Sequence, residues 1–210
     1  MTSINEDHPQ LVPDININDL KDSRINKKIY DSLLIHLNQT LPLCNFKDNP
    51  NYPIYYSDED KKHKIYCLDL EDKEIVCYME YEIQSCDFIN QDWGTQIMVW
   101  RGGNAYEIFS GLSMYVLFEI LLPKVKVIMT DTIQTPKGKD FWEMIIRYSF
   151  NKNKKLKVYF INFQDKTFTL IPTYQKSINL YNKFKPWKDN DINKNYRFAI
   201  SQNDINYNEV

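Results

Sequence analysis

The sequence predicts an α+β fold in which helices flank a single mixed β-sheet with a parallel pair of strands at its centre. Apolar stretches with a two-residue period are joined by short, hairpin-like connections, at 64–70 with 74–84 and at 157–163 with 167–171. An amphipathic segment separates two further strands, 95–100 and 125–131, and a strand–helix–strand crossover makes such strands parallel. A chain of 210 residues, 43% of them hydrophobic, is long enough to bury a core.

The first elements follow from periodicity and punctuation. A helix is expected over 24–39, since Asp22 or Ser23 can cap its start and Pro42 stops it. Its apolar face would consist of Ile29, Leu33, Leu34 and Leu37. Residues 42–62 are polar, contain three prolines and are expected to be irregular.

The central helices have clear boundary signals. Gly102 and Gly103 precede a helix expected from Asn104 to Leu121, with Gly111 inside it and Pro123 just beyond. A second helix begins at Pro136, after Thr135 as the N-cap. The helical spacing of this second helix predicts a buried face made of Trp142, Ile145, Ile146 and Ser149.

The predicted organisation is a loose N-terminal arm over 1–23, one α+β domain over 24–171, and a C-terminal extension over 172–210. The extension is rich in Asn, Lys and Tyr and is expected to be partly irregular, with one short strand at 196–201. Whether its Tyr174, Tyr181 and Trp187 cover the sheet or a partner stays open.

Composition and charge exclude several classes of protein. The net charge of −2 gives no basic field, so we expect no nucleic-acid partner. The longest apolar stretch, LSMYVLFEILL, contains Glu119 and is far shorter than the about 20 residues that cross a bilayer. The polar N-terminus lacks a secretory signal, which favours a cytoplasmic protein without a membrane partner. The four cysteines form no Cys-x-x-Cys pair, and no metal site is expected.

The order of elements, with glycines between the third strand and its helix, resembles the Gcn5-related N-acetyltransferase fold across 24–171. The loop TDTIQTPKGKDFW also resembles a pattern in uncharacterised, often phage-borne proteins of this general fold, carried by Asp131, Gln134, Thr135, Gly138 and Trp142. The resemblance implies that Arg101, Gly102, Gly103 and Asn104 would hold the coenzyme A pyrophosphate. This turn departs from the family's pattern, because Asn104 and Tyr106 stand where the family has small residues.

Two loops are candidate ligand sites, each with a structural alternative. Thr132, Gln134, Lys137 and Gly138 follow the carboxyl end of a central strand, where ligands gather in open sheets. Alternatively, this loop only joins a strand to a capped helix. The Arg101–Asn104 turn would offer backbone N–H groups to an anion at a helix start, or its glycines only make the turn.

Three residues are catalytic candidates. Glu82 shares a strand face with Glu80 and would act as general base for an amine, unless this face is simply solvated. Asp131 ends the central strand, and Tyr148 would supply a phenol as general acid.

Two functions stay open at this point. In the first, the protein is a degenerate acetyltransferase-like protein that holds no cofactor and binds a protein partner, as an inhibitor, immunity protein or mobile-element accessory factor. In the second, it is an acyl-CoA-dependent N-acyltransferase that uses acetyl-CoA. The altered glycine turn favours the first.

Overall fold

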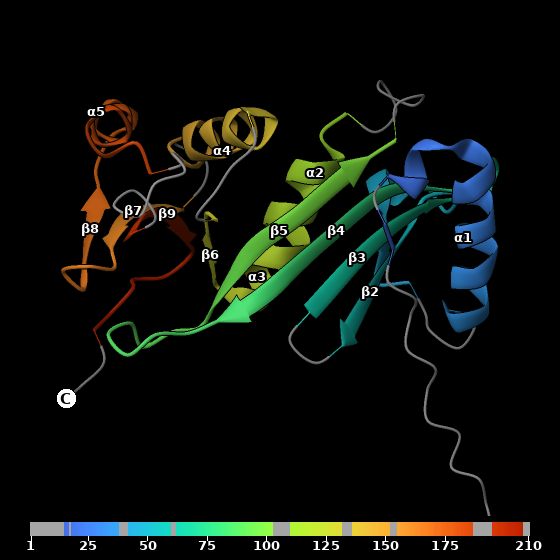
Figure 1. Cartoon of the computed structure of the whole chain (residues 1–210), viewed down its shortest axis with the longest axis horizontal. Coiled ribbons are helices and arrows are strands. Elements are labelled where there is room, and N and C mark those ends of the chain that lie inside the picture. The colour runs from blue at the N-terminus through green and yellow to red at the C-terminus, as the bar shows by residue number, and fades with distance from the viewer. Residues whose placement is uncertain are drawn as a thin grey trace, which may run out of the picture. The chain divides into compact units, whose positions relative to one another are not determined.

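The computed structural model describes residues 15–16, 18–37, 42–59, 62–102, 110–131, 136–151, 155–186 and 195–207 (Figure 1). These residues form an α+β fold with a mixed sheet, as the sequence predicts. The chain divides into two structural units. Unit 1 comprises Met1–Glu80 and Met98–Leu112, and unit 2 comprises Tyr81–Ile97 and Ser113–Val210. Two long strands, β4 (Glu74–Gln84) and β5 (Trp93–Arg101), contribute residues to both.

Unit 1 contains one long helix and the first strands of the sheet. The order of its strands is β1-β2-β3-β4-β5, and β2 pairs antiparallel with both β1 and β3. The other elements of this unit are η1 (Asp19–Lys21), α1 (Ser23–Leu37), β1 (Cys44–Asn45), η2 (Phe46–Asp48), β2 (Pro53–Glu59) and β3 (Lys62–Asp69).

The core of unit 1 lies between α1 and the sheet. Leu33 and Leu37 of α1 pack against Tyr66, Tyr78 and other apolar side chains of the strands. The Asp22 side chain caps α1 by accepting a hydrogen bond from the Arg24 backbone N–H at 2.9 Å. The helix predicted over 24–39 is therefore confirmed as far as Leu37, with Leu33 and Leu37 turned to the core, and residues 38–39 lie outside the described part of the chain.

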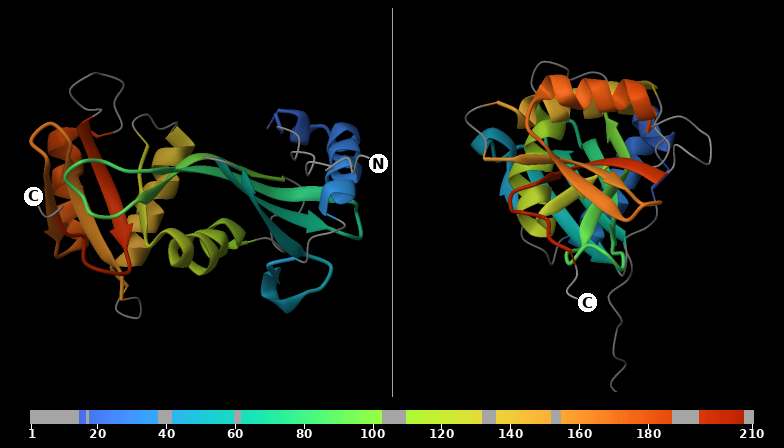
Figure 2. Two further views of the ribbon diagram at one scale, coloured as in Figure 1. Left: turned by 90° about the horizontal axis from the view of Figure 1, so that it is seen from below. Right: turned by 90° about the vertical axis from the view of Figure 1, so that its left-hand side faces the viewer.

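Unit 2 contains the parallel pair. Its strand order is β4-β5-β6-β9-β7-β8, with β6 (Val127–Met129) parallel to β5 through Gly94↔Ile128 and Thr95↔Met129. β9 (Tyr196–Ser201) runs antiparallel to both β6 and β7, so the last strand of the chain lies inside the sheet (Figure 2). The remaining elements are α2 (Leu112–Tyr115), η3 (Val116–Leu121), α3 (Leu122–Val125), α4 (Pro136–Ser149), β7 (Lys157–Asn162), β8 (Thr167–Ile171) and α5 (Tyr174–Phe184).

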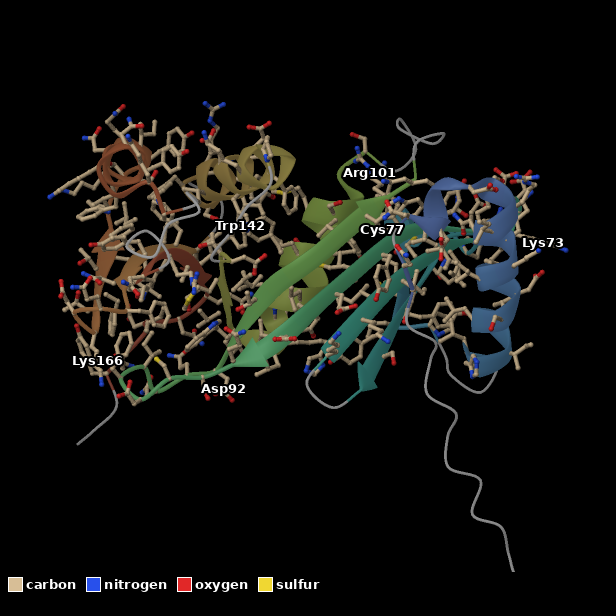
Figure 3. The ribbon with its side chains drawn as sticks, in the orientation of Figure 1. Lys73, Cys77, Asp92, Arg101, Trp142 and Lys166 are labelled. Carbon is tan, nitrogen blue, oxygen red and sulfur yellow. The ribbon has the colours of Figure 1, made fainter. Side chains whose placement is uncertain are left out.

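Helix α4 buries the face that its spacing predicts. Trp142 has no exposed surface and lies beneath the helix (Figure 3), and the other members of this face are also buried: Ile145, Ile146 and Ser149. A second cluster of unit 2 joins Val127 and Met129 of β6 to Phe88, Ile89 and Trp93 of the segment before and at the start of β5.

The expectation that 42–62 is irregular is wrong in part, because strand β2 lies within these residues. Ile54 of β2 is fully buried and pairs with Cys67 of β3. Pro53 is the first residue of the strand, a position where the missing N–H is tolerated. Proline therefore marked the start of a strand here rather than a break.

The helix expected from Asn104 to Leu121 has different bounds in the described residues. Gly111 precedes α2 with φ of 83°, a left-handed conformation that favours glycine, and is not a helical residue. The helical segment continues past the expected stop, since α3 follows η3 directly and contains Pro123. Its middle part, η3, is a π-helix.

Candidate binding groove between α4 and α5

The described half of the glycine turn has structural partners. The Gly102 N–H donates to the Val76 carbonyl oxygen at 3.0 Å, so this amide already has an acceptor in the sheet. A Cβ on Gly102 would lie 3.3 Å from Cη2 of Trp100, which explains a glycine here through the close packing of that ring. Arg101 ends β5, close enough for its charge to influence Cys77 (Figure 3). Gly103 and Asn104 lie outside the described residues.

The polar residues after β6 take part in the sheet. The Thr130 N–H donates to the Phe198 carbonyl oxygen at 2.9 Å, and its Oγ1 accepts from the Phe198 N–H at 3.1 Å. Asp131 follows Thr130, and its carboxylate lies close enough to Arg197 of β9 for the two charges to interact. Burial lowers the pKa of the Arg197 guanidinium, and the Asp131 carboxylate acts in the opposite direction.

The rest of the predicted loop is only partly described. Thr132 and Gln134 lie outside the described residues. Lys137 and Gly138 belong to the first turn of α4, where Gly138 is half-buried, and the Lys137 side chain lies outside the described part.

The three catalytic candidates come from different elements and have different surroundings. Glu82 lies half-buried on β4. Tyr148 lies on α4, with its ring centroid 4.9 Å from that of Phe118 in η3. Asp131 follows β6 and interacts electrostatically with Arg197, as described above.

Glu80, the neighbour of Glu82 on the same face, is not solvated. Its side chain is 8% exposed, accepts a hydrogen bond from the Tyr78 hydroxyl at 2.7 Å, and forms an ion pair with Lys62 Nζ at 3.4 Å. The interpretation of this strand face as outward and solvated is therefore wrong at Glu80.

Unit 2 has a groove of about 320 Å³ between α4 and α5. Its floor contains Ile146 of α4 and Ser177 of α5, both buried. The walls are formed by longer, partly exposed side chains of both helices: Lys139, Glu143, Tyr174, Ile178, Tyr181 and Asn182. The groove thus combines an apolar base with tyrosine, amide and charged walls.

Two cations of α4 lie over tyrosine rings of α5. Lys139 Nζ is 4.8 Å from the centre of the Tyr181 ring, and Arg147 Cζ is 5.3 Å from the centre of the Tyr174 ring. A hydrogen bond to Tyr181 raises the pKa of the Lys139 ammonium, so this group stays charged across the physiological range. Lys139 also lies 3.7 Å from Glu143, one turn further along the same helix.

Both ends of α5 are fixed, which keeps its tyrosines beside α4. The Thr173 hydroxyl caps the start of α5 by accepting from the Lys176 N–H at 3.2 Å. At the other end, the Phe184 ring lies 5.1 Å from the Phe160 ring and 4.6 Å from the Tyr196 ring. Since Phe160 and Tyr196 belong to β7 and β9, the sheet holds the helix that forms one wall of the groove.

The groove was not predicted from the sequence. A signal for α5 is nevertheless present within the expected extension at 172–210, because Thr173 is an N-cap residue followed by Tyr174, Ser177, Ile178 and Tyr181 at helical spacing. Tyr174 and Tyr181, whose role stays open at the level of the sequence, both line the groove, whereas Trp187 lies outside the described residues.

Among the described residues, no group of three or more His, Cys, Asp or Glu side chains is arranged to hold a metal ion. No helix in the described part of the chain is both long and apolar enough to cross a membrane.

Comparison with known proteins assigns no family. No protein-family model matches the sequence, and no curated protein matches it significantly.

Proposed function

We propose that this protein is a degenerate acetyltransferase-like protein that acts by binding a protein partner, with the groove between α4 and α5 as the docking site. An inhibitor, an immunity protein or a mobile-element accessory factor would all act in this way. The order of elements and the parallel pair β5–β6 support the acetyltransferase-like part of the proposal.

The observation that carries the binding function is the composition of the groove. Tyrosine, arginine and methionine are enriched at protein interfaces, where rigid aromatic side chains contribute much of the binding energy. Tyr174 and Tyr181 line the groove, and Arg147 lies over one of these rings.

The test compares capture of a partner by two variants of α5. Ser177→Met fills the floor of the groove, and Asn179→Met adds the same side chain at an exposed position outside it. Both purified variants are first checked for native circular dichroism and thermal unfolding. The proposal is supported if wild type and Asn179→Met both capture the same protein from cells of the source organism and Ser177→Met does not. Equal recovery with both variants contradicts it.

The alternative function is N-acyl transfer with acetyl-CoA, for which the parallel pair and Glu82 on β4 are the supporting features. Against it, the Gly102 amide already has an acceptor in the sheet. Calorimetric titration with acetyl-CoA separates the two. Low-micromolar binding that disappears in Gly103→Tyr favours the transferase, and no binding at millimolar ligand removes it.

A further inference from the structure

The two helices of the groove are basic in a chain whose net charge is −2. Between them, α4 and α5 carry five basic side chains and two acidic ones. The acidic pair consists of Asp140 and Glu143, both on α4, whereas α5 has no acidic residue. A surface of this sign attracts an acidic partner and repels a basic one.

The basic groups nearest the groove are held in defined places. Lys139 lies over Tyr181 and Arg147 over Tyr174, so each cation has an aromatic support from α5. Because the two cations are eight residues apart on one helix, their attachment points differ by about 12 Å along the helix axis. Ile146 and Ile178 contribute apolar surface to the groove that these cations border.

This pattern of charge and apolar surface matches one kind of ligand. A helix with two carboxylates about two turns apart spans the same about 12 Å, and an apolar side chain between them would reach the floor. We infer that the partner docks through an acidic amphipathic helix, whose carboxylates pair with Lys139 and Arg147 and whose apolar side chain enters the groove. This inference rests on the proposed function and specifies the chemistry of the partner.

Glu143 would compete with an acidic partner for Lys139. Its carboxylate lies 3.7 Å from Lys139, and both side chains are partly exposed to solvent, so this i,i+4 pair is weak and readily exchanged. A partner carboxylate would compete with Glu143 for the same ammonium. Removing the charge at this position should therefore strengthen binding of an acidic ligand, while removing the charge at Lys139 should weaken it.

The experiment uses fluorescein-labelled helical peptides and the full-length protein. The first peptide carries a leucine flanked by glutamates two turns apart, and the second has glutamines in place of the glutamates. A labelled single-stranded oligonucleotide serves as a third probe. Fluorescence anisotropy gives the Kd of each probe for wild type, Lys139→Gln and Glu143→Gln. Lys183→Gln is the matched control, since Lys183 lies on α5 outside the groove lining.

The expected result is that the glutamate peptide binds about tenfold more tightly than the glutamine peptide, from two partly exposed charge pairs. Lys139→Gln should weaken this binding about threefold to fivefold, and Glu143→Gln should strengthen it. The control Lys183→Gln removes only a share of the overall charge of the helices and should change the Kd by less than about twofold.

Three results would overturn the inference. Equal binding of the two peptides would exclude recognition of acidic side chains, but it would not contradict the proposed docking of a protein partner in the groove. Preferential binding of the oligonucleotide would assign the surface to nucleic acid. Failure of both peptides to bind at millimolar concentration would exclude an acidic helix, and the capture experiment with Ser177→Met would still decide the proposed function on its own.

Discussion

Replacing Asn26 by alanine should destabilise unit 1 by removing one buried hydrogen-bonding side chain. Asn26 is 2% exposed and lies on the face of α1 that meets the sheet. Its Nδ2 donates to the carbonyl oxygens of Ile75 at 3.0 Å and Leu20 at 3.3 Å, and its Oδ1 accepts from the Ile75 N–H at 2.9 Å. One side chain thus satisfies backbone groups of β4 and of the η1 segment.

The size of the effect follows from the groups left without a partner. Ile75 is fully buried, so water cannot replace the acceptor that its N–H loses. An unsatisfied buried polar group costs about 1–3 kcal/mol. With one N–H and two carbonyl oxygens affected, Asn26→Ala should lower the free energy of unfolding by about 2–4 kcal/mol, a large part of the about 5–15 kcal/mol typical of a domain.

The assay is urea unfolding followed by circular dichroism, combined with hydrogen exchange of the Ile75 amide. Lys27→Ala is the control, because Lys27 is the exposed neighbour on the same helix and its loss should change stability by less than about 0.5 kcal/mol. The Ile75 amide should lose protection in Asn26→Ala alone. Equal stability of the two variants, with an unchanged exchange rate, would refute the role assigned to Asn26.

Three further predictions concern other parts of the chain. Burial raises the pKa of the Cys77 thiol to about 12, so pulsed alkylation at pH 8 followed by mass spectrometry should leave Cys77 unlabelled until the protein unfolds; rapid labelling would contradict its burial. Hydrogen bonding to Lys157 holds the pKa of Asp204 below its ordinary 3.8, so this contact stabilises the fold above that pH and is lost as the pH falls through the lowered value. An NMR titration of the carboxyl carbon that gave 3.8 or higher would rule this out. Gly111→Ala should lower the free energy of unfolding by about 1 kcal/mol in a thermal melt, because Gly111 has φ of 83° while the space around it is open. Gly111→Asn should lower it less, since asparagine adopts this conformation more readily than alanine. An unchanged stability in both variants would contradict the left-handed backbone.

The predicted fold class is confirmed where the sequence pattern is local and repetitive. Strands β4 and β8 have the predicted bounds, and α4 begins at Pro136 and buries the predicted face. The parallel pair was also predictable, because one strand–helix–strand crossover with the usual handedness leaves few alternatives. Periodicity of two or 3.6 residues, with caps and turns, was sufficient for these elements.

The candidate groove was not predictable in the same way. Its walls come from two helices about forty residues apart in the sequence, and only the folded sheet brings them together. The sequence of α5 also contains few aliphatic residues, so its pattern predicts a partly irregular extension rather than a helix. The insertion of β9 between β6 and β7 is likewise a long-range pairing that no local pattern indicates.

The most direct test of the central claim is site-specific photo-crosslinking from the groove in cells of the source organism. A photoreactive residue at Asn182, which lines the groove, is compared with the same residue at Asn179, which is exposed on α5 outside it. If a partner docks in the groove, position 182 should give one crosslinked protein product. This product should be absent when the photoreactive residue is at position 179, and Ser177→Met should abolish it. The same products from both positions, unaffected by Ser177→Met, would contradict a docking site between α4 and α5.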